Sequence, residues 1–257
     1  MEDNPQPDFG LPKALLTLEF GGRTVQHNLC AALARGDLLQ DEQGCLRLPD
    51  ISATPSGTWL YWGDRVYLRP SCRFLSGFLF DIVYGKAAVP QGCHDCYKVK
   101  VCPGNFQALL AVRQLSRGIP CNSKCGPEVN HFFSQELYGG FFYCQGLDHA
   151  HVVYRQVRER VDQTAVLGPG VTMRIKRGCT PYEIHCGPSN LWTFRPEQTE
   201  LEARLLAQFV LPQSQRSETE FATLMRWVEI AHAIGDNSYL EFTKGRRVYP
   251  ATVDYAP

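Results

Sequence analysis

Three cysteines and a histidine lie within ten positions of one another in the stretch CHDCYKVKVCPG, residues 93–104. Thiolates ligate zinc and iron–sulfur clusters, and the spacing of a Cys-x-x-Cys pair lets two sulfurs face one metal centre. The same pair is also typical of dithiol redox proteins. The stretch therefore suggests two kinds of chemistry, metal ligation and thiol–disulfide exchange.

The chain as a whole is rich in cysteine, with 11 in 257 residues. The odd number and the acidic, proline-bearing N-terminus argue against a secreted disulfide framework, so we expect a reducing cytoplasm. The formal net charge is zero, which argues against a general polyanion binder. No apolar run approaches the roughly 18–20 residues that a membrane helix needs, so no membrane partner is expected.

The elements that would position these thiols are clearest in the middle of the chain. The segments 97–102 and 171–176 alternate with period two, while 105–118 and 147–161 have apolar residues at helical spacing. With short strands predicted over 119–129 and 139–145, the order is β-α-β-β-α-β. This is the split βαβ pattern of ferredoxin-like domains, a topology that serves many unrelated functions.

We therefore predict an α+β fold with a central ferredoxin-like domain over residues 91–178. A β-rich N-terminal region, residues 1–90, precedes it, and a mainly helical C-terminal region, residues 179–257, follows. The expected flanking elements are hairpins over 15–29 and 58–69, a buried helix or strand over 71–86, helices over 199–210 and from a capping box at Ser217–Glu220, and a final hairpin over 239–253.

A ferredoxin-like sheet order of 4-1-3-2, with its two central strands taken as parallel, distributes the thiols between two ends of the sheet. Because an extended strand rises about 3.3 Å per residue, Cys96 and Cys102 should be roughly 20 Å apart and cannot share one cluster. One end is expected to collect Cys102, Cys121 and Cys144. The other is expected to collect Cys93, Cys96, Cys125 and Cys179, with Cys72 and Cys186 close by.

This distribution predicts an iron–sulfur protein. Cys93 and Cys96 would be the core ligands of a [4Fe–4S] cluster, completed by Cys179 and by one of Cys72, Cys125 or Cys186. A second group of only three thiols would leave an iron position open, which would make the protein an Fe–S-dependent oxidoreductase or lyase acting with a small-molecule or redox partner. Cys30 and Cys45 are interpreted as small buried apolar residues.

Two alternatives stay open. One is a zinc-stabilised binding module, in which Lys98, Lys100, Arg174 and Lys176 share the open sheet face and bind an anionic ligand. The absence of an RNP-like motif argues against RNA as that ligand. The other is a metal-free dithiol redox protein using Cys93 and Cys96, although this pair precedes a strand and not the helix N-terminus that would lower its pKa.

Acid–base groups accompany the thiols. His94, inside the Cys-x-x-Cys pair, is a candidate ligand or proton donor, and Glu183 and His185 form a candidate acid–base pair. No nucleotide-binding or nucleophile-elbow motif is present. The sequence predicts neither a substrate nor an oligomeric state.

Overall fold

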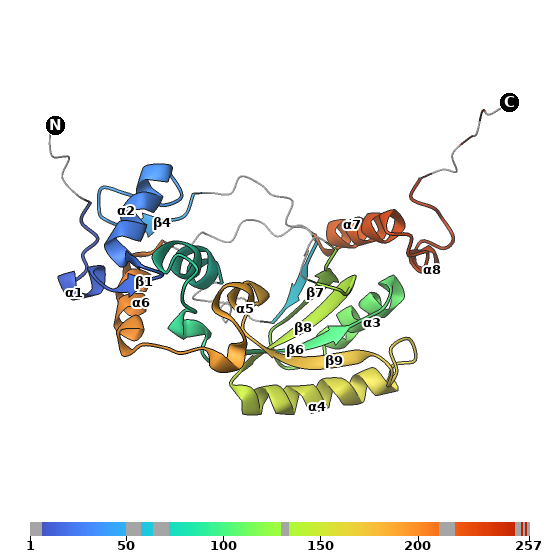
Figure 1. The fold of residues 1–257 in the computed structure, drawn as a ribbon. Helices are drawn as coiled ribbons and strands as arrows, with labels where there is room; N and C mark the ends of the chain where they lie inside the picture. Colours follow the sequence, from blue (N-terminus) through green and yellow to red (C-terminus); the bar gives the residue numbers. More distant parts are fainter. Residues whose placement is uncertain are drawn as a thin grey trace. The chain divides into compact units, whose positions relative to one another are not determined.

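The computed structural model describes the chain in five stretches and two single residues, and it divides into two compact units (Figure 1). Each unit combines segments far apart in the sequence, whereas three consecutive parts were predicted. The described residues are 7–49, 58–63, 72–129, 134–210, 219–249, 253 and 255. The first unit lies within 1–54, 64–96 and 177–216, and the second within 55–63, 97–176 and 217–257.

A five-stranded antiparallel sheet is the basis of the second unit, and the fold is α+β as predicted. The strand order is β5-β7-β8-β6-β9, so the four predicted strands have the expected 4-1-3-2 order, and β5 extends the sheet beside β7. The ferredoxin-like assignment stays a prediction. The strands are β5 (Leu60–Trp62), β6 (Cys96–Cys102), β7 (Ser123–Pro127), β8 (Tyr138–Gln145) and β9 (Thr172–Arg177).

The helices α3 (Phe106–Ser116) and α4 (Leu147–Gln163) pack on one face of this sheet (Figure 1). Alternate strand residues such as Val99, Val101 and Phe142 are fully buried against them and form the core. Two further helices of the same unit, α7 (Glu220–Ala233) and α8 (Tyr239–Phe242), contact α3. Asp236, between them, accepts a hydrogen bond of 2.6 Å from the first backbone N–H of α3.

The directions of the two central strands differ from the prediction. They were expected to be parallel, but the sheet is antiparallel. The cation–π pairs between them agree, because Lys98 lies over the Tyr143 ring and Lys100 over the Phe141 ring, so the numbering rises along β6 as it falls along β8. The C-terminal ends of β6 and β8 therefore lie at opposite ends of the sheet.

The first unit is mainly helical, which contradicts the prediction of a β-rich N-terminal region. The turn at Gly21-Gly22 is present, with positive φ angles of 59° and 77°, but the strands that it joins have two residues each. The expected second strand is helical because the Thr24 side chain caps the N–H of His27, and apolar residues at positions 25, 29 and 32 then face the core.

The elements of this unit surround a core of their own. The segment predicted as a buried helix or strand is the helix η2, which is of the wide π type. This type is rare overall, and where it occurs it is often at a functional site. The elements are α1 (Lys13–Leu16), β1 (Glu19–Phe20), β2 (Arg23–Thr24), α2 (Val25–Arg35), β3 (Leu39–Gln40), β4 (Leu46–Arg47), η2 (Arg73–Val83), η3 (Gln91–Cys93), α5 (Thr180–Cys186), η4 (Ser189–Leu191) and α6 (Pro196–Gln208).

The structure differs from the sequence-based expectation at the C-terminal end. The predicted final hairpin over 239–253 begins as the helix α8, which is followed by a turn at Lys244-Gly245. The helix predicted to start at Ser217–Glu220 is α7, and its N-terminal cap is Thr219, whose side chain accepts the N–H of Ala222. Ser217 lies outside the described residues. Residues 64–69 of the second predicted hairpin lie outside the described part of the chain. Among the described helices, none has the length and apolar character needed to cross a membrane.

Candidate functional site

The turn that carries Cys93 is held by a buried glutamate. Both oxygens of the Glu202 carboxylate accept backbone N–H groups of this turn, at 2.6 Å from Gln91 and 3.0 Å from Gly92. The Tyr84 hydroxyl donates a third hydrogen bond of 2.7 Å. Burial raises the pKa of Glu202, and these three donors oppose that rise. The 3-10 turn η3 is thus fixed by α6 and by the end of η2.

Cys93 lies at the centre of a small aromatic core. Its side chain is 5% exposed and packs in one cluster with Phe80, Tyr182 and Trp192. Its sulfur lies 3.5 Å from the Tyr182 hydroxyl, which is within hydrogen-bond distance for sulfur. Burial raises the pKa of the Cys93 thiol well above its ordinary range, whereas the hydrogen bond to Tyr182 lowers it.

Three further thiols lie near Cys93. The charges of Cys96, Cys179 and Cys72 each raise the pKa of Cys93, so all three lie within electrostatic range of its sulfur. Cys96 and Cys179 also pack against the same aromatic cluster. The first unit therefore brings together the four thiols of the predicted main site from three separate segments.

Backbone geometry brings Cys179 to Cys96. The N–H of Gly178 donates a 2.7 Å hydrogen bond to the carbonyl of Cys96, and Cys179 then caps α5. Gly178 has a positive φ of 60°, and a Cβ at this position would lie 2.6 Å from the Trp192 ring. Only glycine fits here without strain, so Gly178 allows the chain to turn from β9 to α5 beside the cluster.

The thiols of this site differ in exposure. Cys93 is buried, Cys96 and Cys179 are half-buried, and Cys72 is exposed at the start of η2. Cys186, the other predicted fourth ligand, packs against the aromatic cluster, but its thiol donates to the carbonyl of Lys86 at 3.5 Å. Cys72 is therefore the better candidate for the fourth ligand, on the solvent side.

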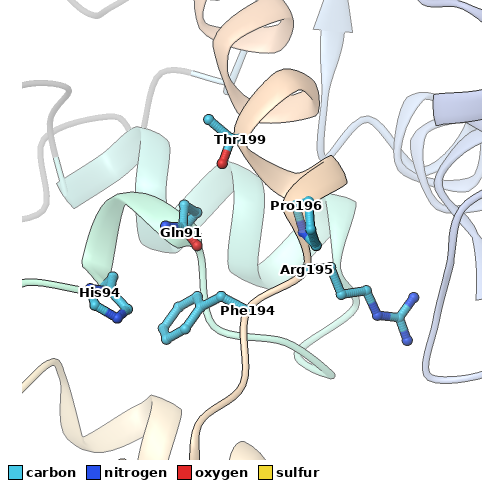
Figure 2. Close-up of a pocket in the computed structure, with 6 residues that line it drawn as sticks. All are labelled: Gln91, His94, Phe194, Arg195, Pro196 and Thr199. Carbon is cyan, nitrogen blue, oxygen red and sulfur yellow. The ribbon is translucent and has the colours of Figure 1, made fainter.

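His94 borders a shallow recess beside this turn (Figure 2). The recess has a volume of about 390 Å³, and the imidazole of His94 meets the Phe194 ring edge-on at 4.8 Å. The Nδ1 atom of His94 lies 2.9 Å from the Asp95 carboxylate, and its backbone carbonyl accepts from Arg177. The remaining lining residues are Gln91, Arg195, Pro196 and Thr199.

The predicted acid–base pair lies on α5. His185 is exposed and packs on the Phe80 ring at 5.9 Å, and its charge lowers the pKa of Asp81, which burial raises. Glu183 is half-buried on the same short helix, and its carbonyl accepts the N–H of Gly187. Their proposed joint role as an acid–base pair stays a prediction.

The other predicted group of three thiols does not converge. Cys102 ends β6, where Arg174 lies 3.6 Å from its sulfur, whereas Cys144 ends β8 at the opposite end of the sheet. Cys121 lies near Cys144, because Tyr143 donates its N–H to Asn122. Cys125 is fully buried in the core of the second unit and is not part of the Cys93 site. The error follows from the wrong strand direction.

The predicted basic face is formed but is partly neutralised. Lys100 is 8% exposed and its ammonium lies 2.5 Å from Glu128 and 3.1 Å from Glu136, which also accepts from Arg174. Lys98 is 9% exposed over the Tyr143 ring, and Lys176 is half-buried on β9. These contacts are those of a buried ion-pair network, so an anion would have to compete with two carboxylates for Lys100.

Comparison with known proteins adds no relative. No family model, curated protein or solved structure matches the chain. The function must therefore be argued from the thiol site itself.

Sequence reasoning missed the residues that support this site. Glu202 lies in a segment with helical periodicity, where a glutamate is ordinarily exposed to solvent. The residues at the start of that helix gave no sign that Glu202 is buried. Tyr182 lies between Cys179 and Cys186, and this spacing was the only available signal. Among the residues that the structure describes, no group of three or more His, Cys, Asp or Glu side chains is found that could hold a metal ion.

Proposed function

We propose that the protein binds a [4Fe–4S] cluster through Cys93, Cys96, Cys179 and Cys72 and acts as a cytoplasmic redox protein. The observation that supports this most strongly is the packing of Cys96 and Cys179 against the aromatic cluster that contains the buried Cys93, with Cys72 within electrostatic range. Four cysteines are the usual protein ligands of such a cluster, and a reducing compartment keeps them available.

A single zinc ion and an iron–sulfur cluster require different spacings of their four cysteine ligands. Four sulfurs around one zinc, each about 2.3 Å from the metal, lie within roughly 4 Å of one another. In a [4Fe–4S] cluster each cysteine ligates a different iron, so its sulfurs are farther apart.

A dithiol redox role is less well supported. The attacking group in thiol–disulfide exchange is the thiolate, and burial raises the pKa of Cys93 well above its ordinary range. In this environment, a bound cluster would supply the positive charge that offsets a buried thiolate. The Cys93 site therefore favours metal ligation.

The test is the iron and acid-labile sulfide content of protein reconstituted under anaerobic conditions. We expect four of each per chain in the wild type, and a large loss in Cys93→Ser and Cys179→Ser. Cys186→Ser is the matched control, because this thiol lies against the same aromatic core and bonds to a backbone carbonyl. Its iron content should equal that of the wild type.

Two outcomes would overturn the proposal. Protein that holds neither iron nor sulfide after reconstitution does not bind a cluster. Colourless protein with one zinc per chain, lost in the same Cys93 and Cys179 variants, would instead support a zinc-stabilised module.

A further inference from the structure

We propose that Cys121 and Cys144 form a dithiol site in the second unit, which a small-molecule disulfide such as oxidised glutathione converts to a cross-strand disulfide bond. Both cysteines are thiols in the structure, and both belong to the unit that contains the five-stranded sheet. Neither is a ligand of the cluster proposed above, so this inference does not depend on that proposal. The geometry behind it is the pairing of β7 with β8.

The register of these two strands places Cys121 directly opposite Cys144. β7 and β8 are antiparallel neighbours, and they are paired along the whole of β7 (Figure 1). In the same register, one residue before β7, the Tyr143 N–H donates a hydrogen bond of 2.8 Å to the carbonyl of Asn122. The pairing therefore continues beyond the first residue of β7, and the next pair in this register is Cys121 with Cys144.

The position of this pair in the ladder suits a disulfide. Hydrogen-bonded and non-hydrogen-bonded pairs alternate along antiparallel strands, and the latter bring their Cα atoms to about 4.5 Å. Because Asn122 and Tyr143 are a hydrogen-bonded pair, Cys121 and Cys144 occupy a non-hydrogen-bonded position. The N–H of Cys121 agrees with this, because it donates to the Ile119 carbonyl at 2.8 Å. Disulfides span Cα separations of roughly 4.4–6.8 Å, so the position fits their geometry.

The two side chains share one face of the sheet and one environment. Directly opposite residues of a ladder project from the same face, and Cys144 is 6% exposed within the core of the second unit. Cys121 packs against the same core but is half-buried, so a reagent reaches it first. Cys125 also lies in this core, but it is fully buried and four residues along from Cys121, a distance of about 13 Å in an extended strand. It is therefore too far away to bond with Cys121.

The reaction consists of two successive substitutions at sulfur. The Cys121 thiolate attacks one sulfur of oxidised glutathione, which breaks the glutathione S–S bond and releases one molecule of reduced glutathione. The Cys144 thiolate then attacks the Cys121 sulfur of this mixed disulfide, and the second glutathione leaves. The protein thiols thus lose two electrons, and these electrons, with the two thiol protons, reduce one glutathione disulfide to two thiols.

Burial sets the conditions under which this exchange can be observed. It raises the pKa of the Cys121 thiol to about 11, so only a small fraction is thiolate at pH 7, and a mildly alkaline buffer is needed. The new bond would close a loop over residues 121–144. A crosslink of this kind stabilises a fold mainly by restricting its unfolded chain, so we expect the oxidised protein to unfold at a higher temperature.

The test is peptide mapping of the full chain after incubation with oxidised glutathione. Remaining thiols are blocked with N-ethylmaleimide in denaturant, and the non-reduced protein is digested with trypsin and chymotrypsin. Chymotrypsin cleaves after aromatic residues, so cleavage within 141–143 separates Cys144 from Cys125. We expect a pair of peptides that joins Cys121 to Cys144 and is lost on reduction with dithiothreitol.

Two variants distinguish a dithiol site from an isolated reactive thiol. Cys144→Ser blocks the second substitution, so we expect glutathione to stay bound at Cys121 and the rise in unfolding temperature to be lost. Cys102→Ser is the matched control, because Cys102 is also a half-buried thiol of this sheet but ends β6. This control should form the link between Cys121 and Cys144 to the same extent as the wild type.

Three outcomes in the wild type would overturn the inference. The first is that Cys121 carries glutathione or stays a thiol while Cys144 is recovered blocked. The second is a link that forms only after denaturation, and the third is a link from Cys121 to Cys125, which would mean that the register ends with β7. If Cys144→Ser fails to fold, the wild-type map still decides between these results. None of them changes the iron and sulfide content expected at the Cys93 site, so the two proposals fail independently.

Discussion

Replacing Glu202 with alanine tests the support of the thiol site directly. The substitution removes the common acceptor of the Tyr84 hydroxyl and of two backbone N–H groups in the turn that carries Cys93. Tyr84 is fully buried and Gln91 is half-buried, so each loses its partner at a cost of about 1–3 kcal/mol. Gly92 is exposed, and water can replace the lost carboxylate oxygen there.

One effect opposes this loss. Burial raises the pKa of Glu202, so removing its buried charge offsets part of the lost stability. The net expectation is a decrease of about 3 kcal/mol in the free energy of unfolding. Urea unfolding at pH 7, followed by circular dichroism, would measure it as a lower midpoint with an unchanged slope.

Glu200→Ala is the control for this experiment. Glu200 lies in the same helix, is mostly exposed and pairs with Arg204 four residues on, an arrangement that stabilises by about 0.3–0.5 kcal/mol. If Glu202→Ala loses no more stability than Glu200→Ala, the carboxylate does not hold the turn. The same two variants should differ in iron content after reconstitution, with the loss in Glu202→Ala.

Three further predictions concern other parts of the structure. Lys100→Met leaves the Glu128 carboxylate buried without its cation and should lower the free energy of unfolding by about 3–5 kcal/mol. In urea unfolding, the double variant Lys100→Met with Glu128→Met should largely recover this loss. If the single variant stays within about 1 kcal/mol of the wild type, the ion pair is not buried as described. Burial raises the pKa of Asp236, but hydrogen bonds from Ser238, Tyr138 and Phe106 outweigh it and hold the pKa below its ordinary value of 3.8. The stability that Asp236 provides is therefore fully present above that value and is lost as the pH falls through the folded pKa. In a series of thermal unfolding measurements at decreasing pH, the midpoint of Asp236→Asn should decline less steeply than that of the wild type. An equally steep decline in both would refute this. Gly178→Ala should lower the iron content after reconstitution, because the new Cβ would strike the Trp192 ring. Gly168→Ala, at a similar positive φ of 70° with open space around it, should keep the iron content of the wild type. Equal iron in both variants would contradict the close approach of Gly178 to Trp192.

The elements around the middle of the chain could be predicted because their patterns are local. Period-two alternation over 97–102 gave β6, and this strand carries Cys96 and Cys102 at its two ends, so the expectation that they cannot share a cluster is consistent with the structure. Helical spacing likewise gave α3 and α4. Such patterns record which side of an element is buried, and this depends only on neighbouring residues.

Strand direction and the support of the site could not be predicted in this way. The direction of β8 relative to β6 depends on how the chain crosses the sheet, and one wrong direction placed Cys102 with Cys144. Likewise, Glu202 is identical in sequence to a solvated helix residue until η3 is packed against α6. Long-range contacts of this kind leave no periodic trace in the sequence.

The hydrogen bonds from the Cys93 turn to Glu202 of α6 have a consequence for biosynthesis. Gln91 and Glu202 are 111 residues apart, so the ribosome must release most of the chain before the turn acquires its acceptor. Cys179 also emerges long after Cys93 and Cys96. Any cluster delivered during translation would meet an incomplete set of ligands. Loading of the proposed cluster should therefore be a post-translational step, and truncated chains ending just before α6 should be poor recipients even though all four proposed ligands are still present.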